Sequence, residues 1–371
     1  MIEDCSAEVR PNMLITQCDL RGSQLKETTV NFRKRQWLVT LLELTGVALG
    51  TSAYAQTRYE ALDFEPQGVS FIQLGGLNDK GWIASSGAAG GDGHTAYLTG
   101  PNGRNNHPIG GDPVQSVNAV NNRGMIAGSS TRGRPFVTGI QGEGRTDLGI
   151  PVDAEYGHAY SINAKGQVVG DYQSAAGTKS FLYDPQGGLV TLNVLNINNH
   201  QAMAINKAGV IVGSYANPDW LPYVAKPPEY KAKSLLNKKL AVSYAQATAI
   251  NDANTVVGAF RDSLGMPGAF ISRDGSPMQD LGAPAGLYIT PMSINDSDLI
   301  VGWYSYTYGP TMNAHAFACQ STCSNLIELT DLVELPDNIV LNQAISVNSS
   351  GQILATASNG RAYLLTPLKQ K

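Results

Sequence analysis

A short pattern of apolar and polar positions recurs along the whole second part of the chain. Each copy has an aliphatic residue, an asparagine, two variable positions and then a residue that accepts a positive φ. The asparagines are Asn78, Asn121, Asn163, Asn206, Asn251, Asn295 and Asn348. Successive asparagines are 43, 42, 43, 45, 44 and 53 residues apart. A repeat of this period indicates one supersecondary unit copied several times.

Each copy predicts a β-hairpin around its asparagine. The aliphatic residue before it ends one strand, and the Gly, Asn or Asp three positions after it adopts left-handed backbone at little cost. A type I turn followed by one left-handed residue is a common hairpin loop, and the asparagine side chain can hold it by bonding backbone two residues on. The second strand is short and β-branched, as in Val168-Val169. A small residue follows seven positions after each asparagine, which predicts close approach of a neighbouring backbone.

Two further strands complete each copy. A small residue or proline followed by an aromatic, as in Ser180-Phe181, predicts a third strand with one ring facing the core. A turn and a short segment such as Asp147-Leu148-Gly149 predict the fourth strand. Four short strands in about 40–45 residues are typical of a propeller blade, which neighbouring blades must cover on both faces.

The two ends of the repeated region predict a closed ring. The last copy stops at its third strand, near Arg361 to Thr366, and a spare strand from Arg58 to Phe64 precedes the first copy. We expect that strand to complete the last blade and to remove the exposed edges. The predicted fold is therefore an all-β, seven-bladed β-propeller over residues 56–371. The rival is an open β-solenoid, which would need capping units at its ends.

These repeats resemble the HAF repeat family of bacterial extracellular proteins, named for a His-Ala-Phe tripeptide. His315-Ala316-Phe317 matches the tripeptide, and residues 159–170 are similar to the family pattern of Ala, Ile-Asn, Gly and Val-Val-Gly. The resemblance covers about residues 58–366. It implies export and propeller-like repeats, and it implies no established reaction. The histidine varies between copies, which disfavours a catalytic role for it.

The N-terminal region predicts a secretory signal over residues 30–55. Arg33-Lys34-Arg35 precede the apolar run Trp37 to Gly50, and Ala53-Tyr54-Ala55 follow it. The run is shorter than the roughly 20 residues that span a bilayer, so we predict no membrane span. We expect cleavage after Ala55 and a secreted or periplasmic protein. Residues 1–29 are interpreted either as a disordered extension or as sequence upstream of the true start.

The charge and composition of the chain bear on which class of partner it could bind. The chain has a formal net charge of −4, and only 15% of its residues are charged, below the usual quarter. No basic stripe for nucleic acid is present in the sequence. This disfavours a nucleic-acid partner. The expected partner is an extracellular glycan or protein, and we also expect a monomeric state and no cofactor.

The cysteines predict one disulfide in the exported part of the chain. Cys319 and Cys323 are the cysteines that follow the expected cleavage site. An even pair in an oxidising compartment usually forms a disulfide. A redox pair or a zinc site is the alternative, but the spacing is not Cys-x-x-Cys and no second ligand pair lies nearby.

A polar residue precedes each asparagine by five positions, at the start of the expected innermost strand. These residues are Gln73, Ser116, His158, Gln201, Gln246, Thr290 and Gln343. In a closed ring they would surround one mouth of the central channel, as a hydrogen-bonding collar for a polar ligand or an ion. The alternative is a solvated end at which these side chains cap backbone groups.

Aromatic residues gather in copies three to six. The ring-bearing residues nine positions after the asparagine are Tyr172, Tyr215, Phe260 and Tyr304, to which Trp220 and Trp303 are added. Tyrosine and tryptophan combine apolar area with a polar tip and suit interfaces with sugars or proteins. The hypothesis is an asymmetric glycan- or protein-binding face, and its alternative is packing between blades.

The sequence shows no catalytic constellation. The five histidines, His94, His107, His158, His200 and His315, lack metal-ligand spacing, and no Gly-x-Ser-x-Gly motif is present. His158, expected at the channel mouth, is the first candidate for an acid–base role. The leading hypothesis is a secreted, non-catalytic binding protein. The alternatives are an extracellular hydrolase or lyase with a pocket at the channel mouth, and a structural matrix component.

Overall fold

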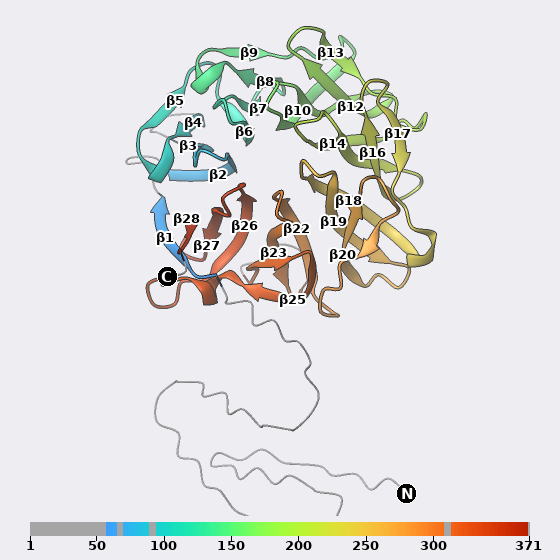
Figure 1. Cartoon of the computed structure of the whole chain (residues 1–371). Helices are drawn as coiled ribbons and strands as arrows, with labels where there is room; N and C mark the ends of the chain where they lie inside the picture. Colours follow the sequence, from blue (N-terminus) through green and yellow to red (C-terminus); the bar gives the residue numbers. More distant parts are fainter. Residues whose placement is uncertain (1–56, 65–69, 89–93, 308–312, 370–371) are drawn as a thin grey trace, which may run out of the picture. The chain divides into compact units, whose positions relative to one another are not determined.

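Seven four-stranded antiparallel sheets follow the seven copies of the asparagine pattern (Figure 1). The first three are β2 (Ser70–Leu77), β3 (Ile83–Ala88), β4 (Thr95–Thr99) and β5 (Asn106–Ile109); β6 (Val114–Val120), β7 (Ile126–Ser130), β8 (Pro135–Thr138) and β9 (Arg145–Asp147); and β10 (Ala154–Ile162), β11 (Val168–Ser174), β12 (Gly177–Asp184) and β13 (Gly188–Thr191). The next three are β14 (His200–Ile205), β15 (Ile211–Ala216), β16 (Trp220–Lys226) and β17 (Lys231–Ser234); β18 (Val242–Ile250), β19 (Thr255–Asp262), β20 (Pro267–Arg273) and β21 (Gln279–Asp280); and β22 (Tyr288–Ile294), β23 (Leu299–Ser305), β24 (His315–Gln320) and β25 (Thr322–Glu328). The predicted seven-bladed propeller is confirmed.

The computed structural model describes residues 57–64, 70–88, 94–307 and 313–369. The predicted extension 1–29, the predicted signal segment 30–55 and its cleavage site lie outside the described residues. In the part of the chain that is described, no helix is long and apolar enough to cross a membrane. Its short 3-10 helices are η1 (Pro101–Gly103), η2 (Ile140–Gly142), η3 (Lys238–Leu240) and η4 (Leu329–Leu332).

The seventh blade is assembled from both ends of the propeller. Its strands are β26 (Leu341–Val347), β27 (Ile353–Ala357), β28 (Ala362–Pro367) and β1 (Tyr59–Phe64). β1 pairs antiparallel with β28 from Tyr59 opposite Pro367 to Phe64 opposite Ala362. Leu368 also donates its backbone N–H to the carbonyl of Arg58 at 2.8 Å. The predicted closure by the N-terminal strand is confirmed.

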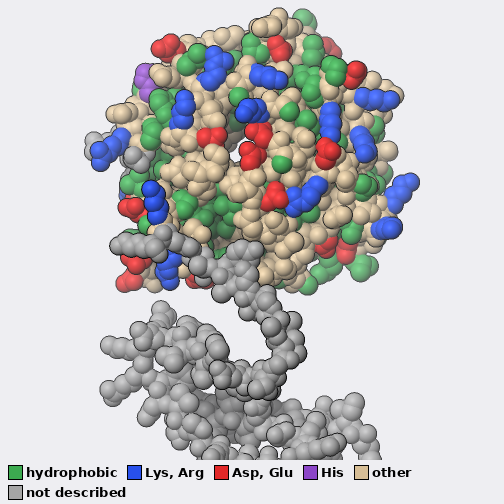
Figure 2. Space-filling model, viewed as in Figure 1, with side chains coloured by type: hydrophobic (Ala, Val, Ile, Leu, Met, Phe, Trp, Pro, Cys, Tyr) green, Lys and Arg blue, Asp and Glu red, His purple; other side chains and the backbone are tan. Residues whose placement is uncertain are grey.

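Seven innermost strands surround the centre of the ring (Figure 1): β2, β6, β10, β14, β18, β22 and β26. We call the opening at this centre, seen in the space-filling view (Figure 2), the channel. All seven asparagine turns follow these strands, so they lie at one end of the channel, which we name the turn face. The innermost strands begin at the opposite end, which we name the loop face. Figure 2 shows a small opening at the centre of the face in view, with acidic side chains around it.

The repeated asparagines form a closed ring of hydrogen bonds. Nδ2 of each asparagine donates to the backbone carbonyl oxygen of the asparagine in the next blade, at 2.9–3.2 Å. The last of these bonds joins Asn348 to Asn78 and so closes the circle. Oδ1 of each asparagine accepts the backbone N–H four positions on, at 2.8–3.1 Å. Each side chain therefore holds its own turn and fixes the neighbouring blade.

The small residues allow close packing of backbone. A Cβ at Gly170 would overlap the carbonyl oxygen of His158 on the paired innermost strand. The glycines seven positions after the asparagine in blades 2, 4, 5 and 6 face the equivalent carbonyl in the same way. This confirms the predicted close approach. Beside them, one aromatic ring per blade is buried in the core: Tyr97, Phe136, Phe181, Tyr223, Phe270, Phe317 and Tyr363.

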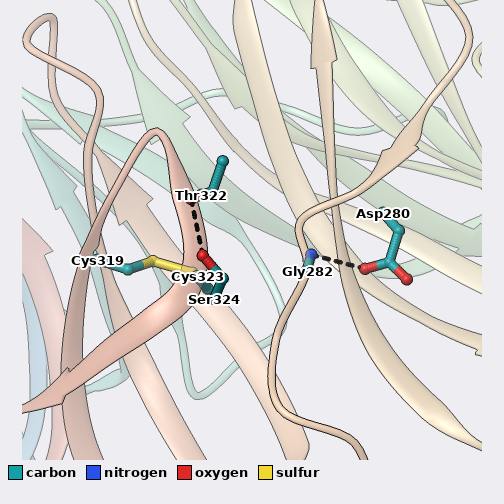
Figure 3. Close-up of a disulfide and its surroundings, with 6 residues drawn as sticks. All are labelled: Asp280, Gly282, Cys319, Thr322, Cys323 and Ser324. Atoms are coloured by element: carbon teal, nitrogen blue, oxygen red, sulfur yellow. Dashed lines mark hydrogen bonds between the residues drawn. A yellow bond between two sulfur atoms is a disulfide. The ribbon is translucent and has the colours of Figure 1, made fainter. Parts of the chain in front are cut away.

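The predicted disulfide is present. Cys319 on β24 is bonded to Cys323 on β25, and the bridge closes the outer hairpin of blade 6 (Figure 3). The backbone N–H of Cys323 donates to the carbonyl of Leu281 in blade 5 at 2.9 Å. The bridge therefore lies at a contact between two blades.

We expect Asn121→Asp to lower the free energy of unfolding by about 2–4 kcal/mol. The carboxylate keeps the acceptor for the N–H of Met125, but it loses the donor to the carbonyl of Asn163 and places a charge against that oxygen. Urea unfolding measures the change. The exposed Asn325→Asp is the matched control, and we expect it to change stability by less than about 0.5 kcal/mol. Equal effects of the two substitutions would contradict a stabilising ring.

Candidate functional site

The predicted collar residues all lie on the innermost strands, between the second and the fifth residue of each strand. The five named as ligand-binding candidates are all half-buried: Gln73, His158, Gln201, Gln246 and Gln343. Gln73 donates through Nε2 to Oδ1 of Asn118 in blade 2 at 3.2 Å. His158 and Gln201 are brought together on one acceptor, the carboxylate of Asp171. The collar is therefore not uniform, and its polar groups converge between blades 3 and 4.

Asp171 is the centre of this convergence. Its side chain, on β11, is 4% exposed. Oδ1 lies 3.3 Å from Nδ1 of His158, which is opposite Asp171 in the β10–β11 pairing. Oδ2 accepts from the hydroxyl of Tyr160 at 3.3 Å and from Nε2 of Gln201, in the next blade, at 2.9 Å. We name Tyr156, His158, Tyr160, Asp171 and Gln201 the Asp171 cluster.

A β-bulge places Tyr160 in the cluster. The pairing of β10 with β11 shifts register between Ala159 and Ser161, so Tyr160 is the bulged residue. The same shift occurs three positions before the asparagine in every innermost strand. Bulges re-aim side chains and are frequent beside functional sites. The scaffold thus offers this position in all blades, and blade 3 fills it with a tyrosine.

The rings of the cluster form a row along β10. His158 and Tyr160 are stacked with ring centroids 5.9 Å apart, and Tyr156 meets His158 edge-on at 5.5 Å. Tyr156 is 43% exposed, whereas Asp171 is buried. Burial, followed by the charge of Asp171, raises the pKa of the Tyr160 phenol. Tyr160 therefore stays protonated and donates to the carboxylate.

The Asp171–His158 contact fixes the histidine ring. An ionised carboxylate only accepts hydrogen bonds, so Nδ1 carries a proton where the two meet. In a neutral imidazole the other nitrogen, Nε2, is then an acceptor. Blade 3 thus presents an oriented acceptor, flanked by two tyrosine rings. Such a nitrogen can accept a hydrogen bond from a ligand or take up a proton from it.

The predicted aromatic residues lie mostly inside the blades. The rings of Tyr172, Tyr215, Phe260 and Tyr304 are 5–7% exposed. The hydroxyl of Tyr172 bonds that of Thr191 at 2.8 Å, and the hydroxyl of Tyr215 donates to Ser234 at 3.0 Å, so both reach the fourth strand of their blade. Their role in binding remains a prediction, and little of their surface is accessible to a ligand.

The two predicted tryptophans are half-buried. Trp220 begins β16, and Trp303 on β23 lies opposite Thr290 of β22 and Ala316 of β24. Their part in binding also remains a prediction. In the described residues, no group of three or more His, Cys, Asp or Glu side chains is placed to hold a metal ion.

Sequence reasoning missed Asp171, Tyr160 and Tyr156. Asp171 stands eight positions after its asparagine, where the other copies have Ser86, Ser129, Ser214, Ala259, Trp303 and Thr356. A carboxylate in one copy of seven was the available signal, since this position adjoins the collar of the next blade. A search for departures from the repeat would have found it, whereas a search for shared positions does not.

A second buried histidine has a structural role. Nδ1 of His200 accepts from the backbone N–H of Ser180 at 2.9 Å and lies 2.8 Å from Oγ of the same residue. That hydroxyl is also 3.2 Å from the hydroxyl of Tyr223. Burial, followed by the charge of Lys179, lowers the pKa of His200 to about 4. The neutral imidazole therefore joins blades 3 and 4 as an acceptor.

Comparison with known proteins establishes the fold alone. No family model matches the chain, and no curated protein matches its sequence. An oligogalacturonate lyase from Vibrio parahaemolyticus is similar with a TM-score of 0.58 and 9% identity, over 82% of this chain and 93% of that one. An oligogalacturonate lyase in complex with manganese gives a TM-score of 0.57 and 11% identity, over 83% and 93%. A prolyl endopeptidase gives 0.53 and 8%, over 82% of this chain and 51% of its own.

We expect the protein to lose stability in acid through His200. Its pKa is about 4 when folded and about 6.5 when unfolded, so between these values the unfolded chain binds the extra proton. The free energy of unfolding therefore falls as pH drops from about 6.5 to about 4, by about 3 kcal/mol from this residue. His200→Asn keeps an acceptor for Ser180 but does not titrate. Urea unfolding at several pH values should give the variant a shallower loss, and identical slopes would contradict the assignment.

Proposed function

We propose that this protein is an exported, non-catalytic β-propeller that binds a glycan at the loop-face mouth of its channel, through the Asp171 cluster. The observation that carries the proposal is the convergence of His158, Tyr160 and Gln201, from two blades, on one buried carboxylate. Small-molecule sites typically combine a few convergent polar groups with aromatic surface. The resemblance to HAF repeat proteins and the signal-like N-terminal sequence support the proposal of export.

The chemistry of the cluster suits a sugar. A sugar ring carries hydroxyls that donate and accept hydrogen bonds, and it has apolar faces. The exposed ring of Tyr156 offers apolar area beside the oriented His158, whose Nε2 accepts from a donor. Gln201 gives one N–H to Asp171 and retains its carbonyl oxygen as a further acceptor. The cluster thus presents acceptors next to a stacking surface.

The charge of the cluster restricts the kind of glycan. Asp171 is paired with His158 and, among the described residues, with no lysine or arginine. A carboxylate in a partly desolvated mouth repels an acidic sugar. The geometry therefore favours neutral or amine-bearing glycans over uronic acids. This preference differs from the names of the two similar lyases, which give an acidic sugar chain, oligogalacturonate, as the substrate of those enzymes.

The second candidate function is acid–base catalysis on a bound glycan. The Asp171–His158 pair favours it, because a carboxylate that holds Nδ1 leaves Nε2 as an oriented base. Two of the solved structures with a similar fold are lyases by name, and their similarity supports no more than the shared architecture. Product formation that His158→Ala abolishes would favour this candidate over simple binding.

We expect the full-length protein to bind neutral or amine-bearing members of a glycan array and to leave them unchanged. Asp171→Asn should weaken binding at least about ten-fold, because it loses the charge that orients His158. Asp153→Asn, an exposed change on the same face, is the matched control and should bind normally. An array without any bound glycan, or binding that Asp171→Asn leaves intact, would overturn the proposal. Calorimetry on the strongest array glycan provides the affinities.

A further inference from the structure

Blade 6 carries a second cluster of tyrosine, histidine and carboxylate. Nδ1 of His315 lies 2.9 Å from Oε1 of Glu328, and the hydroxyl of Tyr304 donates to Oε2 of the same carboxylate at 3.1 Å. The rings of His315 and Tyr304 are stacked with centroids 5.2 Å apart. Tyr306 stands nearly perpendicular to both rings. We name these four residues the Glu328 cluster.

The two clusters share one arrangement. In each, a carboxylate meets Nδ1 of a histidine with one oxygen and a tyrosine hydroxyl with the other. In each, the histidine is stacked on that tyrosine, at interplanar angles of 24° and 18°. In each, a second, exposed tyrosine meets the histidine edge-on. Both histidines are therefore oriented with Nε2 as the acceptor.

Internal duplication does not explain this match. His158 precedes its asparagine by five positions, whereas His315 follows its own by 20. Asp171 follows its asparagine by eight positions, and Glu328 follows its own by 33. The tyrosines, the histidine and the carboxylate of the first cluster lie on the two inner strands of blade 3, whereas those of the second come from β23, β24, β25 and the residue after β23 in blade 6. The same constellation thus arises from positions that are not equivalent in the repeat.

Both clusters open on the loop face. Tyr156 lies near the start of β10, and the innermost strands begin at that face. β23 runs away from the Asn295 turn and ends at Ser305, so Tyr306 follows it at the same face. Tyr306 is 70% exposed, and Leu264, which is 85% exposed, lies in the β19–β20 loop of the neighbouring blade at that face. The loop face therefore presents two similar clusters, one in blade 3 and one in blade 6.

We propose that the two clusters are paired subsites for one amine-bearing glycan polymer, which bridges them across the loop face. This inference rests on the proposed glycan binding and deepens it. Each site combines a carboxylate, an acceptor nitrogen and the face of a tyrosine, and a protonated amine interacts favourably with all three. The side chain of Glu328 is 24% exposed and can pair with an ammonium directly. Two subsites on one rigid scaffold bind a polymer more tightly than either binds a short fragment.

The experiment compares short and long chains of β-1,4-linked glucosamine, by calorimetry on the full-length protein. We expect two trimers to bind each protein molecule, and a chain of about fifty sugars to bind at least about ten-fold more tightly than the trimer. Glu328→Gln or Tyr306→Ala should reduce the trimer to one per molecule and remove most of the gain of the long chain. The fully N-acetylated trimer, which has no amine, should bind at least about five-fold more weakly.

Two controls separate folding from binding. Tyr306 is exposed, so its substitution should leave the melting temperature unchanged. Glu334→Gln, an exposed change of the same type, should retain two sites and the full gain of the long chain. One trimer per wild-type molecule, or a long-chain gain that survives Glu328→Gln and Tyr306→Ala, would overturn the paired subsites. If the array shows neutral glycans bound through Asp171 and no glucosamine bound, the proposed function stands and this inference fails.

Discussion

The ring of asparagine hydrogen bonds is the constraint on which the propeller depends. Each of the seven side chains is 3–6% exposed and uses both of its ends: the oxygen holds its own turn, and the nitrogen fixes the next blade. A buried carboxamide that lost either partner would cost free energy, so each blade is held at one separation from its neighbours. The final bond, from Asn348 to Asn78, closes the ring of side chains, and β1 separately completes the sheet of the blade that contains Asn348.

The repeated features of the blades explain what the sequence could predict. The turn, the glycines and the core ring are set by backbone sterics and burial. These constraints are the same in every copy, so they produce a repeated sequence pattern. The count of blades and the closing strand followed from that repeated pattern, whereas the disulfide was predicted from the pair of cysteines after the expected cleavage site. The asparagine was interpreted as a turn residue, and its second role, toward the next blade, was missed because a single repeat does not show which atom of a neighbour its amide reaches.

The candidate site was less predictable for the opposite reason. Positions such as those of Asp171 and Tyr160 vary between copies, so repetition gives no hint of their importance. The predicted collar included His158 and Gln201, but the carboxylate that both of them contact comes from another strand. Aromatic rings nine positions after the asparagine proved to be buried, while exposed Tyr156 and Tyr306 stand outside that register. In this propeller, the residues of the candidate site therefore lie at positions where the copies differ.

The most direct test of the ring is hydrogen exchange of its carboxamide groups. Protein labelled with ¹⁵N at asparagine would be transferred to D₂O, and the side-chain NH₂ signals followed by NMR. The structure requires seven asparagine side chains whose bonded N–H exchanges only when the blades separate, far more slowly than that of exposed asparagines such as Asn325. Exchange of all asparagine carboxamides at the rate of exposed groups would contradict the account.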